Sequence, residues 1–273
     1  MNEIISYFSS IPSSHRSLIL VGGITIFWLI ENTFPMFKFS YKKWNHAGIN
    51  FFFTFTTITI NFLLAFILLK TANLTLENNF GILQWLPEMN IWLYAIIGLL
   101  VLDLIGAYAV HWIQHKIPVM WRFHLIHHAD TWIDTTSANR YHPGESVIRF
   151  VFTTLGVLVV GSPIWLVFLY QTLSIVATQF NHANICLPKK LDTFLSYCIV
   201  SPDMHKVHHH HVLPYTDSNY GNIFSVWDRL FGTFKTLLKT DIVYGIDTHT
   251  KPEEHNNIPN LLRIPFLPKR KMP

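Results

Sequence analysis

Long apolar runs constrain this chain more than any other feature. A helix needs roughly 20 apolar residues to cross the ~30 Å hydrocarbon core of a bilayer. Two runs meet that requirement, at residues 49–69 and 90–110, and the second is interrupted by a single aspartate. A third run, at residues 17–37, is weaker because Glu31 and Asn32 interrupt it. We therefore expect an all-α, polytopic membrane protein.

A longer apolar stretch, residues 147–180, contains a helix break at Gly161-Ser162-Pro163. Proline removes a helix hydrogen bond and glycine leaves the helix easily, so the stretch should form two helices joined by a tight turn. Each half is shorter than a full crossing requires. The predicted architecture is thus a transmembrane helical bundle of about three spans plus one re-entrant helical hairpin that returns to the same face.

Basic residues orient these spans. They are Lys38, Lys42 and Lys43 after the first span, and Lys116, Arg122, Arg140 and Arg149 after the third. The connection between the second and third spans holds one lysine and two glutamates. Because loops rich in lysine and arginine stay in the cytoplasm, both basic segments are expected on the cytoplasmic face. The first run could instead be a signal peptide, since Arg16 precedes it, but no small-residue cleavage site follows and a retained anchor is favoured.

Composition excludes several classes of protein. Hydrophobic residues make up 50% of the chain and charged residues 13%, about half the share usual in soluble domains. The formal charge of +4 comes from scattered lysines, so a nucleic-acid partner is not expected. Cys186 and Cys198 have neither metal nor redox pair spacing, which suits a reducing compartment on the active face.

Histidine is the informative excess, with 16 in the chain. Three short clusters hold eight of them: His111 and His115; His124, His127 and His128; His205, His208 and His209. Spacings of three and four residues put side chains on one helical face, and imidazole is a common ligand of transition metals. One ion seldom takes more than six protein ligands, so two ions sharing the set are expected. Imidazole ligation suits iron, zinc, copper or nickel about equally.

Six further residues are candidates for the same site. His182 follows the hairpin on the same face and is expected to be a ninth ligand. Direct ligation or a hydrogen bond to a ligand is considered for His142, Asp103, Glu145, Asn181 and Asp203. Three roles remain open for His142: a metal ligand, a hydrogen-bond partner of Glu145, or an anchor of its loop. Asp103, inside a span, should make a hydrogen bond and not bind metal, and Asp203 is equally well explained as a helix N-cap.

Several motifs together make a resemblance visible. They are His111–His115, residues 121–128, Arg140-Tyr141-His142-Pro143 with Glu145, Asn181-His182-Ala183-Asn184, Ser201-Pro202-Asp203-Met204-His205 through His209, residues 217–221 and residues 227–233. Over roughly residues 99–234 the chain resembles the fatty acid hydroxylase/sterol desaturase superfamily of membrane di-iron oxygenases. The resemblance implies two iron ions per chain, with zinc an alternative in isolated protein. It also implies molecular oxygen, an external electron donor such as a cytochrome b5-like or ferredoxin-like protein, and a lipid or sterol substrate that is hydroxylated or desaturated.

Two other functions remain open. A metal-binding or metal-transporting membrane protein would need ligands deep within the spans, where Asp103 is the one acid. A membrane zinc hydrolase would need a general base such as the glutamate of HExxH, which the clusters lack. The expected organisation is an N-terminal transmembrane anchor region at 1–90, a catalytic domain at 91–240 and a tail at 241–273, irregular from residue 261 and lying on the membrane surface.

Overall fold

The computed structural model describes residues 1–268 and consists of helices joined by loops, with three isolated bridges. The helices are α1 (Asn2–Ser9), α2 (Ser13–Thr33), α3 (Lys43–Glu77), α4 (Ile82–Trp85), α5 (Ile91–Asp103), η1 (Leu104–Ala109), α6 (Val110–Lys116), α7 (Pro118–His128), η2 (Thr135–Asn139), α8 (Pro143–Val160), α9 (Ile164–His182), α10 (Lys189–Leu195), α11 (Pro202–His208), α12 (Val226–Leu230), η3 (Lys239–Asp241), α13 (Pro252–His255), α14 (Ile258–Arg263) and η4 (Ile264–Phe266). The prediction of an all-α chain is confirmed.

Four helical stretches are long and apolar enough to cross a membrane: Ser13–Thr33, Lys43–Trp85, Ile91–Lys116 and Pro143–Val160. Their outer surfaces carry large apolar side chains, among them Phe62 of α3, which is 79% exposed. Apolar surface of this extent is typical of contact with lipid, where helices satisfy their own backbone groups. The chain is therefore an integral membrane protein, as the sequence predicts.

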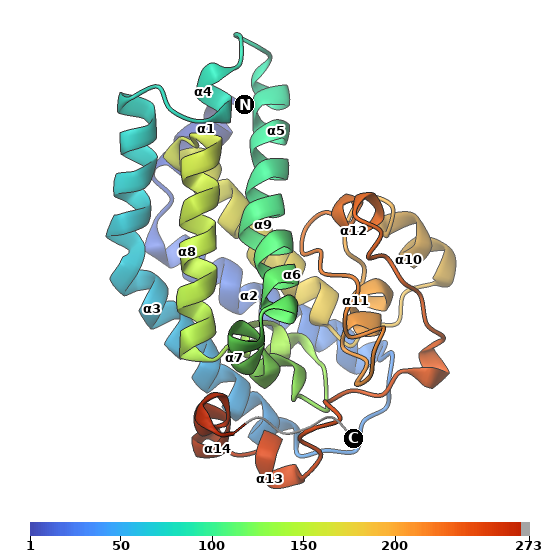
Figure 1. Cartoon of the computed structure of the whole chain (residues 1–273). Coiled ribbons are helices and arrows are strands. Elements are labelled where there is room, and N and C mark those ends of the chain that lie inside the picture. Colours follow the sequence, from blue (N-terminus) through green and yellow to red (C-terminus); the bar gives the residue numbers. More distant parts are fainter. Residues whose placement is uncertain (269–273) are drawn as a thin grey trace.

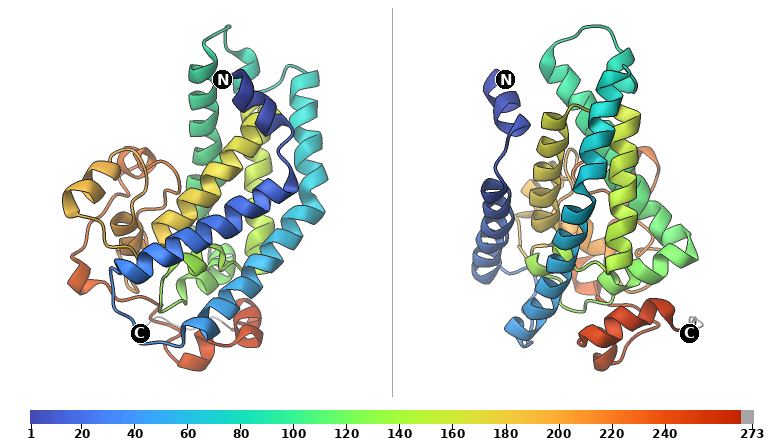
Figure 2. Two further views of the ribbon diagram at one scale, coloured as in Figure 1. Left: turned by 180° about the vertical axis from the view of Figure 1, so that it is seen from behind. Right: turned by 90° about the vertical axis from the view of Figure 1, so that its left-hand side faces the viewer.

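An upright bundle of α3, α5, α8 and α9 forms the centre of the molecule, and α2 runs obliquely across its back against α9 (Figures 1 and 2). The bundle interior is apolar. Leu102 of α5, Val157 of α8 and Leu166 of α9 are fully buried in one cluster there. This packing fixes the helices whose ends carry the histidines.

The apolar stretch at 147–180 forms the predicted pair of helices, α8 and α9, joined at Gly161. Gly161 has a φ of +69°, a left-handed conformation in which glycine ends a helix without strain. Gln84 Nε2 donates to Gly161 O over 2.8 Å, so the turn lies beside the connection from α3 to α5. The pair is longer than expected because Pro143 already starts α8. α8 rises about 27 Å at 1.5 Å per residue and is among the four stretches long and apolar enough to cross a membrane, so the estimate that each half is too short was wrong for α8.

One irregular turn interrupts the helix that leads to the first histidine cluster. Residues Leu104–Ala109 are π-helical, between α5 and α6. A π turn adds a residue to the helical repeat and rotates the next helical turns about the axis, and such turns are frequent at functional sites. It sets the direction in which His111 and His115 point, and periodicity in the sequence did not reveal it.

The end of the bundle opposite α4 collects helix ends that are far apart in the sequence. Glu31, at the end of α2, accepts hydrogen bonds from Thr135 N and Asn184 N. His46, near the start of α3, contacts Asp130 after α7. The short helices α7 and α10 to α12 cover this end and one side of the bundle (Figure 1). The histidine clusters lie among these helix ends.

The tail differs from the sequence expectation. From residue 261, where an irregular chain was expected, the described part forms the end of α14 and then η4. Leu261 is fully buried in an apolar cluster with Phe53 of α3 and Leu125 and Ile126 of α7, so protein contacts and not only lipid order this segment. Positions 269–273 of the predicted tail lie outside the described residues.

Candidate metal centre

Nine histidines gather in two neighbouring groups. The five-histidine group is His111, His115, His124, His128 and His208, and the four-histidine group is His127, His182, His205 and His209. Within each group, one ligand atom per residue lies within 4.8 Å of all the others. These are the nine residues that the sequence nominates as ligands, drawn from α6, α7, α9 and α11 with its C-cap. Their binding of metal stays a prediction.

Each cluster of three histidines divides between the two groups. On α7, His124 and His128 belong to the five-histidine group, whereas His127 belongs to the other. On α11 and its C-cap, His205 and His209 belong to the four-histidine group, whereas His208 belongs to the five-histidine group. Successive residues lie about 100° apart around a helix. Neighbouring histidines therefore point to different groups, and α7 and α11 each contribute to both.

The distances between imidazole nitrogens fit metal ligation. His182 Nε2 lies 3.1 Å from His127 Nε2 and 3.1 Å from His205 Nε2. In the five-histidine group, His124 Nε2 lies 3.1 Å from His111 Nε2. Two nitrogens bound to one ion at about 2.1 Å are separated by about 3.0–3.4 Å. A shared ion accounts for these contacts better than hydrogen bonds, since one ring proton cannot serve several acceptors at once.

Two further nitrogens support the same conclusion. His115 Nε2 and His208 Nε2 are buried and have no hydrogen-bond partner in the part of the chain that the structure describes. A buried polar atom left unpaired costs about 1–3 kcal/mol. An ion at the centre of the five-histidine group would satisfy both atoms, so the residues present fit a metal.

Burial also keeps these ligands neutral. For the histidines of α7 and α11, including the C-cap of α11, burial and then the neighbouring imidazoles hold the pKa well below its ordinary value. A neutral imidazole has a free lone pair on one nitrogen, which is the form that binds metal. Protonation does not compete with metal binding here near neutral pH.

Backbone carbonyls orient two rings of the five-histidine group. His111 Nδ1 donates to Tyr220 O over 2.8 Å, and His208 Nδ1 donates to Ser218 O over 2.7 Å. In each case the Nδ1–H is engaged, which leaves Nε2 as the ligand atom. The loop after α11 thus determines which nitrogen of each ring faces the centre.

Carboxylates orient two more rings of this group. His124 Nδ1 donates to Glu145 Oε1 over 2.7 Å, and Arg149 Nε donates to the same oxygen over 2.9 Å. His115 Nδ1 lies 3.2 Å from Asp217 Oδ1. Burial would raise the pKa of Asp217, but hydrogen bonds from His115 and its neighbouring lysine lower it to about 2. Carboxylates in this position raise the basicity of a ligand imidazole.

Two buried aspartates hold the loop that supplies these carbonyls. Asp103 accepts from Ile223 N over 3.3 Å and from Trp227 Nε1 over 3.1 Å. Asp228 accepts from Tyr220 N over 2.8 Å. Asp103 therefore makes hydrogen bonds, as expected, and makes them to the loop that orients the histidine rings. Sequence reasoning assigned no role to the loop or to Asp228, although residues 217–221 and 227–233 were among the family motifs.

The four-histidine group has fewer outer contacts. His182 Nδ1 contacts Asn181 Oδ1 at 2.7 Å and Thr178 O at 2.8 Å. Lys206, fully buried, donates to His182 O and to Asn181 O at the end of α9, and burial lowers its pKa to about 7. The Nδ1 atoms of the other three members have no hydrogen-bond partner among the described residues.

Two of the further candidates, His142 and Asp203, are engaged elsewhere in the fold. His142 is the N-cap of α8, where its Nδ1 accepts from the first turn and its Nε2 lies 3.3 Å from Leu262 O. Of the three alternatives for His142, this placement favours the loop anchor. Asp203 lies 3.1 Å from Lys239 Nζ. Ser201 is the N-cap of α11, so the N-cap explanation of Asp203 was wrong by two residues.

A buried polar network behind α7 was missed. His46 Nε2 lies 2.9 Å from Asp130 Oδ1. Arg140, fully buried, donates to Ile126 O over 3.2 Å and to His255 O over 2.6 Å. The network ties α3 and the tail to the helix that carries three of the histidines. Its signals in the sequence were the proximity of Asp130 to the cluster and the motif that contains Arg140, and its partners on α3 could not be read from spacing.

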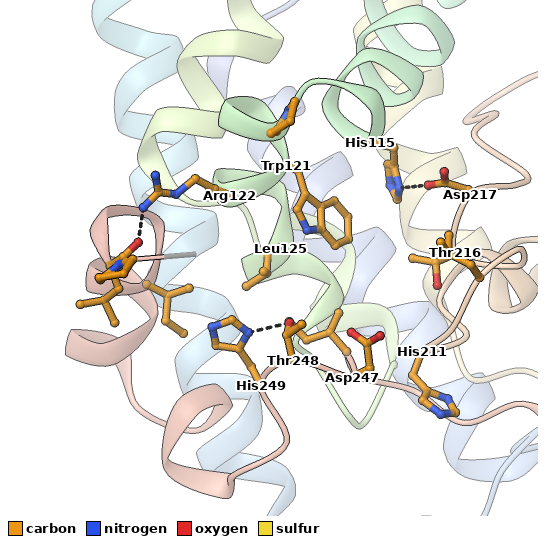
Figure 3. A pocket seen from close by; sticks show the side chains of 16 residues that line it. His115, Trp121, Arg122, Leu125, His211, Thr216, Asp217, Asp247, Thr248 and His249 are labelled. Carbon is orange, nitrogen blue, oxygen red and sulfur yellow. Dashed lines mark hydrogen bonds and ion pairs between the residues drawn. The ribbon is translucent and has the colours of Figure 1, made fainter. Parts of the chain in front are cut away.

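A cavity of about 370 Å³ adjoins the five-histidine group, between α7, the segment after α11 and the tail (Figure 3). His115 and Trp121 form part of its wall. The Trp121 ring centroid lies 4.8 Å from that of His115 and 5.3 Å from that of His128. His115 thus brings the five-histidine group to the cavity wall, and the Trp121 ring lies beside both His115 and His128.

Comparison with known proteins places this arrangement in a family. The model of the family described as fatty acid hydroxylase matches residues 95–233, more than half of the chain. The chain belongs to the fatty acid hydroxylase family. The resemblance read from the sequence motifs is confirmed. All nine histidines and the loop that orients them fall inside the part matched by the fatty acid hydroxylase model.

Curated relatives of this fatty acid hydroxylase family member are distant. It is 24% identical over 151 residues to the ornithine lipid hydroxylase of Rhizobium tropici, covering 55% of this chain and 44% of the relative. It is 26% identical over 208 residues to the alkylglycerol monooxygenase of Danio rerio, covering 75% and 44%. The human alkylglycerol monooxygenase is 29% identical over 151 residues, covering 53% and 31%. The chain spans less than half the length of these relatives, and no solved structure matches it.

Proposed function

We propose that this chain is a membrane-bound, non-haem di-iron monooxygenase or desaturase that uses molecular oxygen and an external electron donor to hydroxylate or desaturate a lipid or sterol alkyl chain. The observation that carries the proposal is the pair of adjacent, buried histidine groups within a fatty acid hydroxylase match. The relatives named as a lipid hydroxylase and as alkylglycerol monooxygenases support a lipid substrate. The catalytic unit is proposed to be residues 91–240, with 1–90 as anchor and 241–273 as tail.

The chain's own residues would hold and shield the metals. Two iron ions bound by the nine histidines would supply oxygen activation and oxidation of an unactivated C–H bond. Glu145 and Asp217 fix the tautomer of His124 and His115 and strengthen their lone pairs. Burial of the Nε2 atoms excludes water, which protects a reactive centre from side reactions. Zinc fits the same donors and is the substitute expected in protein isolated without iron.

We also propose that the histidine groups lie on the cytoplasmic face, where a cytochrome b5-like or ferredoxin-like donor has access. The lysines and arginines of the flanking loops support this. Cys186 and Cys198 are exposed, and they lie between His182 and His205 in the sequence with no candidate span between them in the described part of the chain. A membrane-impermeant thiol reagent should therefore label them from the cytosol. In a variant without these cysteines, Glu88→Cys, in the loop at the opposite end, should be labelled from outside; the reverse pattern would contradict the orientation.

Lipid turnover tests the activity. Lipids extracted from cells with and without the chain are compared by mass spectrometry for gain of one oxygen or loss of two hydrogens. His111→Ala, His124→Ala and His208→Ala should each abolish the difference while the protein remains in the membrane, because each removes a ligand from one group. His15→Ala, an exposed histidine of α2, is the control and should leave turnover intact. Full turnover by His208→Ala would favour the alternative, a metal-binding or metal-transporting protein without oxygenase activity.

A further inference from the structure

The cavity beside the five-histidine group contains two charged side chains of opposite sign that are not paired. Arg122 of α7 and Asp247 of the tail both line it (Figure 3). Neither makes an ion pair with another described residue, whereas Asp217 on the same wall is paired with Lys116. Arg122 donates to Leu267 O, a neutral acceptor that leaves the guanidinium charge uncompensated.

A partly buried charge without a counter-charge is unfavourable, because it loses hydration and gains no partner. Arg122 and Asp247 are both partly buried. One ligand that carries both a cation and an anion would compensate the two at once. A ligand of a single charge would satisfy one side chain and leave the other unpaired.

The remaining wall suits an ammonium group and an alkyl chain. Trp121 lines the cavity, and an aromatic face attracts a cation through its π electrons. Apolar side chains also line the cavity, among them Leu125, Ile264 and Leu213, and Leu213 is 57% exposed. Exposed apolar residues beside a charged cavity fit an amphiphile and do not fit a small soluble zwitterion.

We propose that this cavity binds the zwitterionic head group of the lipid substrate, with an ammonium group between Asp247 and Trp121 and a phosphate or carboxylate against Arg122. This rests on the proposed function, since it makes the cavity the head-group site of the same centre. Because His115 of the five-histidine group lines the cavity, the head group is held beside the centre and selects which lipids are presented to it.

Binding measurements on the full-length, metal-loaded protein in an uncharged detergent test this. Four amphiphiles with one alkyl chain and different heads are compared by calorimetry: phosphoethanolamine, phosphate, primary amine and glycerol. The phosphoethanolamine amphiphile should bind about tenfold more tightly than the others, because two charge-assisted contacts form only with it. Asp247→Asn should remove its advantage over the phosphate head, and Arg122→Gln its advantage over the amine head.

Asp241→Asn and Arg263→Gln change exposed charges outside the cavity and are the matched controls. They should leave all four affinities unchanged. Metal content and thermal unfolding of each variant report whether it is folded. The proposal would be overturned if the protein bound the four heads with equal affinity. It would also be overturned if Asp247→Asn bound the four amphiphiles as Asp241→Asn does. No oxygen or reductant is needed, so a failure here is distinct from a failure of lipid oxidation in the turnover experiment.

Discussion

The two histidine groups differ in how firmly the protein holds them. In the five-histidine group, four rings are held at Nδ1, by the carbonyls of Ser218 and Tyr220 and by the carboxylates of Glu145 and Asp217. In the four-histidine group, His182 alone has such a contact among the described residues. The first group also has two acidic neighbours, whereas no carboxylate contacts a ring of the second in the described part of the chain.

This difference teaches that the two proposed metal positions are not equivalent. Rings already oriented lose little freedom when an ion binds, and carboxylates behind them strengthen the bond to the metal. The five-histidine position is therefore expected to bind its ion more tightly. The four-histidine position depends on the ion itself to orient most of its ligands, so its ion should leave first.

The largest expected effect compares two adjacent residues, His127 and His128, which belong to different groups and lack an Nδ1 partner among the described residues. His127→Ala leaves three rings in its group, one of them held, whereas His128→Ala leaves four held rings. His127→Ala should reduce the metal content to about one ion per chain, and His128→Ala should leave it near two. Elemental analysis after gel filtration measures this; equal losses would show that the groups are equivalent.

A smaller effect should follow from changing the outer contacts. Glu145→Gln removes the charge behind His124 but keeps a hydrogen-bond acceptor, and should weaken metal binding at the five-histidine position by about 10–100-fold. Asn181→Ala is the matched change for the other group, where Thr178 O still contacts His182, and should affect that position alone and more weakly. Competition with a chelator of known affinity separates the two steps. A single step that shifts equally in both variants would refute separate positions.

The smallest effect should come from His142→Ala, which touches neither group. Loss of the N-cap of α8 should lower the free energy of unfolding by about 1 kcal/mol, seen as a lower midpoint of thermal unfolding in detergent. Metal content should remain that of the unmodified protein. Loss of an ion in this variant would mean that His142 is a ligand and that one of the two groups is larger than the geometry indicates.

Sequence reasoning found the nine histidines that gather in the two groups because their signal is local. Spacings of three and four residues, as between His124 and His128, are readable without a fold, and so are the apolar runs that predict spans. The sequence did not show which histidine belongs to which of the two groups. His127 and His128 are neighbours in sequence, and only the crossing of α7, α9 and α11 determines which group each ring enters.

The outer contacts were beyond the sequence for another reason. His111 is held by the backbone carbonyl of Tyr220. Every residue has such a carbonyl, so the residue types in the sequence do not indicate this contact. His46 and Asp130 are 84 positions apart, and each is ordinary in its own segment. The π turn at 104–109 likewise depends on packing against α8 and leaves no periodic signature. Glu145 was named as a candidate because it lies in a motif, and the ring it contacts became apparent only from the fold.

The order of these contacts along the chain has a consequence for biosynthesis. The loop that holds three rings of the five-histidine group, and Asp228 that fixes it, come after the last of the nine histidines. While the ribosome is still adding residues before 217, the ligands emerge without the groups that orient them. If the histidines bind metal as proposed, stable loading is expected only after synthesis of nearly the whole matched region, so that the spans enter the membrane before the metal binds.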